Sequence, residues 1–449
     1  MRRSFSVLLA CAAAFTGVRC SPPAADGELV LLVVVDTLRR DALGCYGGPA
    51  DASPHIDALA NEGVRFDQAI ATSGWTLPSV ASLLTGTLPV VHKARGQKTR
   101  LTPISPDVPT AAELLTEADF ATGAVVNAAF LSPLLGIDRG FERFDHRHAF
   151  NREIRRADET VRDALALIDE RPATRRFLLV HLFDPHLDYD PPGWGEALSR
   201  RRCLELGAAG LDTVRERYAG EVRAVDSAVG ELVEGLRERG LWERTTLVLC
   251  ADHGEEFWEH GGFEHGHSLY DELIHVPLIV RPRPPAPIAS RPIASPVSLI
   301  DVMPTLFEWE GVEAPDTFLG RSLTGLIAGE TASTAASPPI FSQGRLYGSD
   351  LLSWRTERYH YLFDRGALAQ GANSLFDWRA DPGEQNDLSQ SHPELVSELH
   401  GELARFFGDL QHRSRLLTVP DVRDMSPSRV REWTESLDSL GYTDDGNGR

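Results

Sequence analysis

Two long apolar runs that end in an acidic residue are the clearest pattern in the chain. Residues 28–36 read ELVLLVVVD and residues 245–252 read TTLVLCAD. An apolar run without alternation is typical of a strand buried on both faces, as in a parallel sheet. Shorter apolar runs predict further strands at residues 121–126, 176–183 and 276–280.

Segments with helical spacing lie between these strands. Residues 53–63 (SPHIDALANEG) predict a helix with Ser53 as N-cap, Pro54 in the first turn and Gly63 at the end. Other helical patterns cover residues 78–86, 107–117, 152–169, 211–239 and 297–306. This alternation predicts an α/β fold with a mostly parallel or mixed central sheet sandwiched by helices.

A change in composition marks the end of this unit. Residues 282–296 are rich in proline, and residues 329–339 are small and polar. Beyond them, strands are predicted at 340–343 and 354–363, and helices at 392–407 and 428–440. We therefore expect a catalytic domain over residues 28–328 and a smaller C-terminal α+β subdomain over residues 339–449.

The N-terminus predicts export. Arg2 and Arg3 precede an apolar run at residues 5–18 that is too short for a permanent membrane span. Residues 1–20 are therefore interpreted as a signal peptide, with Cys20 as the lipid-modified first residue of a bacterial lipoprotein. The alternative is ordinary secretion with cleavage near Ala24 and Ala25. Both routes predict an exported protein, either periplasmic or anchored to a membrane.

The amino-acid composition limits the classes of molecule that the protein is expected to bind. The chain has 45 Lys and Arg against 65 Asp and Glu, which gives a formal charge of −20. Proteins that bind nucleic acid neutralise phosphates with clustered basic residues, so no nucleic-acid partner is expected. Lys93 and Lys98 are the only lysines, and we expect both at the solvated surface. Five of the 15 histidines lie between His253 and His275.

Asp36 and Asp252 each follow a predicted buried strand. The carboxyl ends of parallel strands meet at one edge of the sheet, where ligands bind in open α/β folds. Two neighbouring carboxylates resist joint ionisation, and a divalent cation would relieve that repulsion. The segment 252–255 (DHGE) adds candidate ligands beside the second acid. The alternative is that both aspartates only cap the helices that follow.

Thr76 opens the helix that contains Pro78. Backbone N–H groups and the helix dipole favour negative charge at such a position, which suits a nucleophile that must lose its proton. A divalent cation would make the threonine alkoxide accessible near neutral pH. The alternative is that Thr76 is simply an N-cap.

Several motifs, in their order along the chain, resemble the sulfatase family of the alkaline phosphatase superfamily. They are DTLRRDALGCYG (36–47), SPHIDALA (53–60), TLPSVASLLTG (76–86), DHGE (252–255) with EHG (259–261), LYDE (269–272) with VPLIV (276–280), and SLFD (374–377) with DPGE (381–384). The similarity covers about residues 28–390. It implies the alkaline phosphatase-like fold and an ester hydrolase.

The departures from the family pattern bear on the chemistry. Thr76 stands where sulfatases carry a cysteine or serine that is converted to formylglycine, so no formylglycine is expected. Val80 replaces an arginine, and Thr37 replaces a second aspartate. The family's sulfate-binding lysines are missing; Asn127 falls near one of these positions, and residues 265–267 fall near the other. Superfamily members with a threonine nucleophile act on phosphate esters.

The resemblance also implies roles for individual residues. One divalent cation would be held by Asp36, Asp252, His253 and the Thr76 oxygen; family habit favours Ca²⁺, and Mg²⁺ or Mn²⁺ also suit these ligands. His186 resembles the histidine near the leaving group and would act as general acid or hydrogen-bond donor. The expected roles of the remaining candidates are catalysis for His265 and substrate binding for Asn127, His260 and His267.

The sequence therefore predicts an exported, metal-dependent hydrolase of sulfuric or phosphoric esters with Thr76 as nucleophile. Its substrate would be a small molecule, a glycan or a lipid that carries such an ester. The alternative is a non-catalytic lipoprotein that keeps the fold and the metal site, as Thr37, Val80 and the missing lysines suggest. Neither reading determines the oligomeric state.

Overall fold

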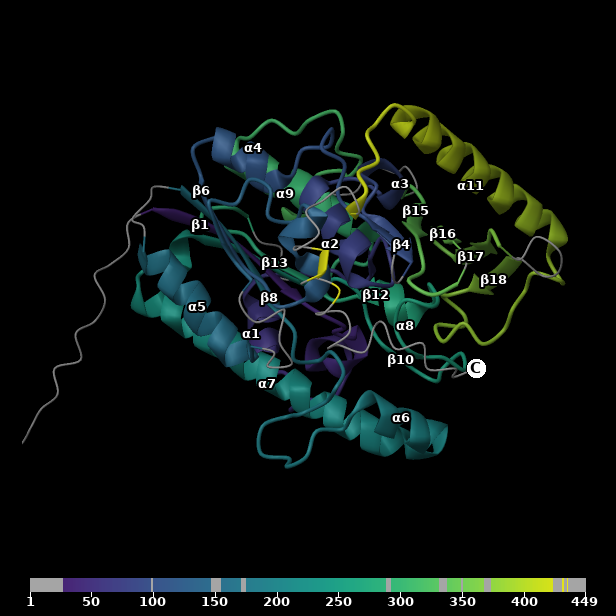
Figure 1. The fold of residues 1–449 in the computed structure, drawn as a ribbon, viewed down its shortest axis with the longest axis horizontal. Helices are drawn as coiled ribbons and strands as arrows, with labels where there is room; N and C mark the ends of the chain where they lie inside the picture. The colour runs from purple at the N-terminus through teal and green to yellow at the C-terminus, as the bar shows by residue number, and fades with distance from the viewer. Residues whose placement is uncertain are drawn as a thin grey trace, which may run out of the picture.

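Figure 1 shows the computed structural model, which describes residues 27–97, 100–146, 155–170, 175–287, 292–330, 337–348, 350–366, 373–422, 430–431 and 434. The expected signal peptide, Cys20, Lys98 and nearly all of the helix expected at 428–440 lie outside these residues. Within them, no helix is long and apolar enough to cross a membrane.

A seven-stranded mixed sheet forms the centre of the molecule. In spatial order its strands are β2 (Val64–Arg65), β13 (Leu278–Arg281), β9 (Thr245–Ala251), β1 (Glu28–Val35), β8 (Arg175–Leu182), β6 (Ala121–Val125) and β7 (Arg143–Asp145). The strands from β9 to β7 are parallel, whereas β13 runs antiparallel to both of its neighbours, β9 and the edge strand β2. The apolar runs at 28–36 and 245–252 become β1 and β9, the adjacent strands in the middle of the sheet.

Helices cover both faces of this sheet, as Figure 1 shows. One group contains α1 (Pro54–Glu62), α5 (Ala157–Glu170) and α7 (Leu211–Glu238), which pack on one another. The other group contains α2 (Thr76–Thr85), α4 (Ala111–Glu117) and α9 (Val302–Glu310). The predicted α/β sandwich is thus confirmed.

A four-stranded antiparallel sheet forms the C-terminal part. Its strands are β15 (Ile340–Gln343), β16 (Leu351–Arg355), β17 (Tyr359–Asp364) and β18 (Asn373–Asp377), and α11 (Pro393–Ser414) packs against it. The remaining elements are short. They are β3 (Ala69–Ile70), β12 (His275–Val276) and β14 (Val297–Ser298) in one sheet, the pairs β4 (Arg95–Gln97) with β5 (Arg100–Thr102) and β10 (Glu256–Phe257) with β11 (Phe263–Glu264), and the helices α3 (Pro89–His92), α6 (Arg200–Leu206), α8 (Asp271–Ile274) and α10 (Thr324–Ile327).

Three expectations from the sequence were wrong in detail. Residues 354–363 do not form one strand, because the chain turns after Arg355 and pairs back as β17. The helix expected at 297–306 starts with Val297 and Ser298 in a strand, which pairs with β3. Lys93 is buried, and its ammonium donates to the carbonyl of Val90 at 2.9 Å, which offsets the loss of solvent.

Candidate functional site

The central strands carry Asp36 and Asp252 to the same edge of the sheet. Val35 at the end of β1 lies beside Ala251 at the end of β9, and each aspartate is the next residue. Both side chains are fully buried. The strand argument made from the sequence is confirmed, because two parallel neighbours in this register must place the residues that follow them side by side.

Two further groups converge on these carboxylates. His253 Nε2 lies 3.5 Å from Asp36 Oδ1 and 3.5 Å from Asp252 Oδ2. Thr76 Oγ1 lies 3.5 Å from Asp36 Oδ2 and 3.3 Å from His253 Nε2. The four residues named from the resemblance thus form one buried cluster, although they come from three separate parts of the chain.

This cluster fits a divalent cation. Asp36 Oδ1 and Asp252 Oδ2 are buried and accept no hydrogen bond. Burial and the neighbouring charge of Asp36 raise the pKa of Asp252 well above its ordinary value. For Asp36 burial also acts to raise the pKa, but the nearby imidazoles outweigh it and hold the pKa below its ordinary value. Two such carboxylates can both ionise only if a positive charge faces them.

His181 is a member of the cluster that the sequence reasoning did not assign. It lies in β8, next to Val34 of β1, and its Nε2 is 3.4 Å from Asp36 Oδ2. Both ring nitrogens are buried without a hydrogen bond. Asp36, His181 and Asp252 each offer one ligand atom, and these atoms lie within 4.8 Å of one another. A polar residue inside an apolar strand was the available signal.

Thr76 is the first residue of α2, as predicted, and it is 1% exposed. Trp75 precedes it in extended conformation, and every residue of the helix is buried. Ser79 donates to the carbonyl of Asp252 at 2.6 Å, which ties this helix to the end of β9. The hydroxyl therefore sits at a helix N-terminus, where negative charge is stabilised.

Thr37, the residue directly after Asp36, has an unusual backbone conformation. Its φ is 54°, in the left-handed region that β-branched residues rarely adopt. Its carbonyl accepts from Tyr218 at 2.8 Å, and Tyr218 in turn accepts from the backbone N–H of Arg39 at 2.7 Å. These bonds hold the turn that aims Asp36, and such strain is typical of functional sites.

His186 and His265 lie beside the cluster. Their ring centres are 5.0 Å apart, and the ring of His265 is 4.5 Å from that of His253. His186 Nδ1 is 2.7 Å from the carbonyl of Leu187 and therefore acts as donor. Burial lowers the pKa of His186, and it lowers that of His265 to about 3, so both rings are neutral near pH 7.

Glu255 orients His265. Its Oε1 lies 2.9 Å from His265 Nδ1, and its Oε2 accepts from Tyr189 at 3.2 Å. Burial raises the pKa of Glu255 to about 7. A carboxylate on one ring nitrogen fixes the tautomer and leaves the other nitrogen for the site. Tyr189, from the loop after β8, is a further residue that the sequence reasoning missed.

The side chain of Asn127 makes hydrogen bonds to other groups of the protein. Its amide nitrogen donates to the carbonyl of His181 and to Thr160 Oγ1, and its oxygen accepts from Arg155 Nε at 2.9 Å. These bonds tie the segment after β6, which carries Asn127, to β8, to Arg155 before α5 and to Thr160 within α5. The structure thus places Asn127 behind His181, with its amide already engaged.

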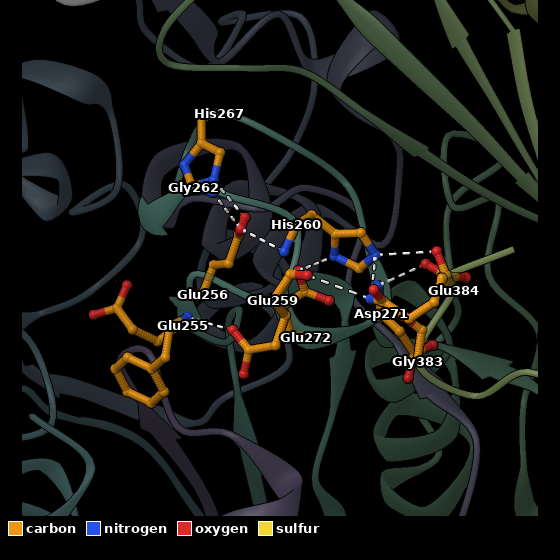
Figure 2. Close-up of polar contacts among 12 residues, drawn as sticks. Glu255, Glu256, Glu259, His260, Gly262, His267, Asp271, Glu272, Gly383 and Glu384 are labelled. Carbon is orange, nitrogen blue, oxygen red and sulfur yellow. Dashed lines mark hydrogen bonds and ion pairs between the residues drawn. The ribbon is translucent and has the colours of Figure 1, made fainter. Parts of the chain in front are cut away.

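His260 and His267 are held in a separate cluster, which Figure 2 shows. His260 Nδ1 lies 2.7 Å from Glu272 Oε1, and its ring stacks on Tyr270 with centres 3.7 Å apart. His267 Nε2 lies 2.6 Å from Glu256 Oε2. The ligand atoms of Glu256, His260 and Glu272 are close enough to hold an ion. However, their carboxylates are already paired with imidazoles, and this pairing with Glu272 raises the pKa of His260 to about 9 despite its burial.

Comparisons with known proteins agree with this geometry. A sequence model of the sulfatase family matches residues 28–312. The N-acetylglucosamine-6-O-sulfatase of Bacteroides thetaiotaomicron is 22% identical, over 86% of this chain and 88% of that protein. Arylsulfatase K of Xenopus laevis is 29% identical over 42% of this chain, and the chain spans only 36% of that relative's length.

A solved structure extends the likeness of the fold. The phosphonate monoester hydrolase of Agrobacterium radiobacter is 18% identical and superposes with a TM-score of 0.69, over 85% of this chain and 96% of the other. The family match covers more than half of the chain and includes the strands that carry Asp36 and Asp252. This chain therefore belongs to the sulfatase family.

Proposed function

We propose that the protein hydrolyses sulfuric or phosphoric esters with Thr76 as the nucleophile. One observation carries the proposal: Thr76 Oγ1 lies at the start of α2, within 3.5 Å of both Asp36 and His253. A threonine that served only as N-cap would need neither neighbour. Sugar sulfates are the favoured sulfate substrates, because a relative acts on N-acetylglucosamine 6-O-sulfate groups; phosphate esters suit a threonine nucleophile.

Asp36, Asp252, His181 and His253 would hold a divalent cation, which when bound would lower the pKa of the Thr76 hydroxyl and offset the charge of the ester group. The family favours Ca²⁺, and Mg²⁺ or Mn²⁺ remain candidates. The second imidazole adds weight to Mn²⁺ or Zn²⁺, since nitrogen ligands suit these ions better. Metal analysis of the purified protein decides between them.

The residues of the chain would then have separate roles in the reaction. His253 Nδ1 donates to the carbonyl of Gly254 at 2.9 Å, so the lone pair of Nε2 faces Thr76 Oγ1. Thr76 gives its hydroxyl proton to water as its oxygen attacks sulfur or phosphorus; the bond to the leaving oxygen breaks, and that oxygen takes a proton. Water supplies this proton, because His186 and His265 are neutral near pH 7 and each already engages its Nδ1. Water then hydrolyses the ester on Thr76.

The test combines turnover with detection of the intermediate. We expect hydrolysis of an aryl sulfate, a phosphate monoester or a phosphodiester. Thr76→Ala should lower it by at least about 10³-fold, as expected for loss of a nucleophile. Thr85→Ala, which removes a buried hydroxyl from the same helix, serves as control. A mass increase on Thr76 would identify the ester class, whereas metal binding without turnover on any panel would support the non-catalytic alternative.

We also propose export through the N-terminal segment, as a lipoprotein anchored at Cys20. Fractionation of bacteria that express the full chain should place the protein outside the cytoplasm. Labelling with a fatty-acid analogue should be lost in Cys20→Ser. Release of unlabelled wild-type protein into the periplasm would instead indicate ordinary secretion.

A further inference from the structure

A cavity of about 270 Å³ lies beside the start of α2. Trp75 and the β4–β5 hairpin form one side, and residues from the C-terminal sheet form the other. In Figure 1, β4 lies between α2 and β15. Trp75, which lines the cavity, directly precedes the proposed nucleophile Thr76 in the chain. Neither the mechanism above nor the metal cluster uses it.

The cavity is lined by buried polar atoms without a partner. Trp75 is 1% exposed, yet its indole Nε1 makes no hydrogen bond; the amide oxygen of the fully buried Gln343 is also without a partner, but as an acceptor it does not attract an anion. A Cβ on Gly344 would lie 3.7 Å from Trp75 Nε1, so this glycine of the lining borders the indole N–H. Buried donors without a partner are costly and mark places where a ligand supplies the missing acceptor.

The lining is also positively charged. Arg95, Arg345 and Arg365 contribute three guanidinium groups against the single carboxylate of Asp350. Arg365 pairs with Asp350 at 2.8 Å, and Arg345 pairs with Asp364 at 3.0 Å. Arg95 makes no ion pair or side-chain hydrogen bond within the described part of the chain. Guanidinium groups bind sulfate, phosphate and carboxylate through paired N–H donors.

We propose that this cavity binds a second anionic group of the same substrate molecule whose ester is attacked at Thr76. The inference rests on the proposed function and sharpens its substrate class: esters that carry two oxyanion groups, such as a disulfated sugar or a sulfated uronic acid. Arg95 provides the charge, and the indole N–H of Trp75 provides a neutral donor. Simple aryl esters would leave both groups without a partner and would bind more weakly.

Binding without turnover tests this proposal. In Thr76→Ala protein, calorimetry would compare glucosamine carrying N-sulfate and 6-O-sulfate groups with glucosamine 6-sulfate. We expect the disulfated sugar to bind more tightly. Addition of Arg95→Gln should weaken its binding by about 10-fold, the scale of one charge-assisted contact, with little effect on the monosulfate. Arg162→Gln, an exposed arginine of α5 paired with Asp158, is the control.

A second variant and a second ligand make the result specific. Trp75→Phe keeps the ring but removes the N–H, and it should reproduce part of the loss for the disulfate only. A monosulfated disaccharide with a glucuronate would separate a carboxylate from a sulfate in the cavity. Equal loss for both glucosamines, no loss in Arg95→Gln, or binding of neither sugar would overturn the proposal.

The experiments distinguish failure of the cavity proposal from failure of the proposed function. Binding that depends on Arg95, in a protein with intact Thr76 that hydrolyses no ester, would retain the cavity and reject the catalytic proposal. Hydrolysis with identical KM values for Arg95→Gln and wild-type protein on both sugars would do the reverse.

Discussion

A histidine inside an apolar strand changes how the metal site is understood at the residue scale. His181 sits in β8 with both ring nitrogens buried and without hydrogen bonds, 3.4 Å from Asp36. A satisfied core histidine would donate to a carbonyl, as His186 does to Leu187. This arrangement supports the proposal that His181 is a ligand of the divalent cation.

Replacement of this residue tests the assignment. His181→Ala should weaken binding of the divalent cation by at least about 10-fold, the lower limit for disturbing groups around a metal. Titration of metal-free protein with Mn²⁺ or Ca²⁺ measures it. His92→Ala is the control, because His92 is equally buried but bonds to Ser82, six residues after Thr76 in α2, and not to the carboxylates. Unchanged affinity in His181→Ala would remove the residue from the site.

The histidines after Asp252 also differ from one another in their hydrogen-bond partners. Neutral His265 is directed by Glu255, while His260 and His267 are paired with Glu272 and Glu256. In the sequence, residues 265–267 fall near one position of the missing lysines of the family. The structure divides these histidines between two clusters, and the arginines of the cavity beside Trp75 supply positive charge from another direction.

At the scale of elements, the loop after β9 has no spare room. A Cβ on Gly254, between His253 and Glu255, would lie 2.0 Å from the carbonyl oxygen of Glu272. That atom belongs to the backbone of α8 and cannot move away cheaply. Glycine here lets the two segments approach closely enough to fix both neighbours in the site.

Gly254→Ala should therefore destabilise the protein by about 1–3 kcal/mol or more, the usual cost of overpacking. Thermal unfolding followed by circular dichroism measures this loss. Gly408→Ala is the control, because nothing lies within 4 Å of its Cβ position in α11. That substitution should stabilise by up to about 1 kcal/mol through helix propensity. Equal melting temperatures for the two variants would contradict the steric argument.

The contact between α7 and the loop after β8 carries a pH dependence. Glu221 of α7 is buried beside Arg156, and burial raises its pKa from 4.5 to about 8. The folded protein keeps this proton up to about pH 8, whereas the unfolded chain releases it near 4.5. The contribution of Glu221 to stability is therefore full below pH 4.5 and falls as pH rises through about 8.

Glu221→Gln should flatten this part of the profile, because the amide stays neutral. Urea unfolding at intervals between about pH 5 and 9, the range that linkage makes informative, would show a smaller loss of stability in the variant. Glu216→Gln, an exposed position on the same helix, should leave the profile of the wild type unchanged. A steeper fall in Glu221→Gln would reverse the assigned sign.

At the scale of the whole molecule, α8 joins the C-terminal sheet to the central domain. Asp271 receives Arg355 of β16 at 2.5 Å and His275 at 2.8 Å. Its backbone N–H donates to Glu384, which also pairs with His360 of β17. Because Arg355 is 1% exposed, its charge depends on this pairing.

Asp271→Asn should destabilise the protein by about 3–5 kcal/mol, as expected when one partner of a buried ion pair is removed. Calorimetry should show an earlier transition, and limited proteolysis should release the C-terminal sheet first. Asp158→Asn, in an exposed pair with Arg162, should change stability by less than about 0.5 kcal/mol. A loss no larger than that of the control would show that the junction does not depend on Asp271.

The sequence alone determined the central sheet and the principal cluster. Apolar runs without alternation are typical of buried parallel strands, and an acid directly after such a strand lies at its carboxyl end. Asp36, Asp252 and the helix that starts at Thr76 follow from these local rules. The motif resemblance supplied His253 and the family.

Only the tertiary structure decided which other side chains join them. Sequence spacing cannot tell which of several histidines in one loop points inward, since a turn of a few residues redirects each ring. His265 therefore joined the site, while His260 and His267 paired with glutamates elsewhere. His181 and the cavity arginines come from segments distant in sequence. Their proximity depends on strand order and on the docking of the C-terminal sheet, which no local pattern encodes.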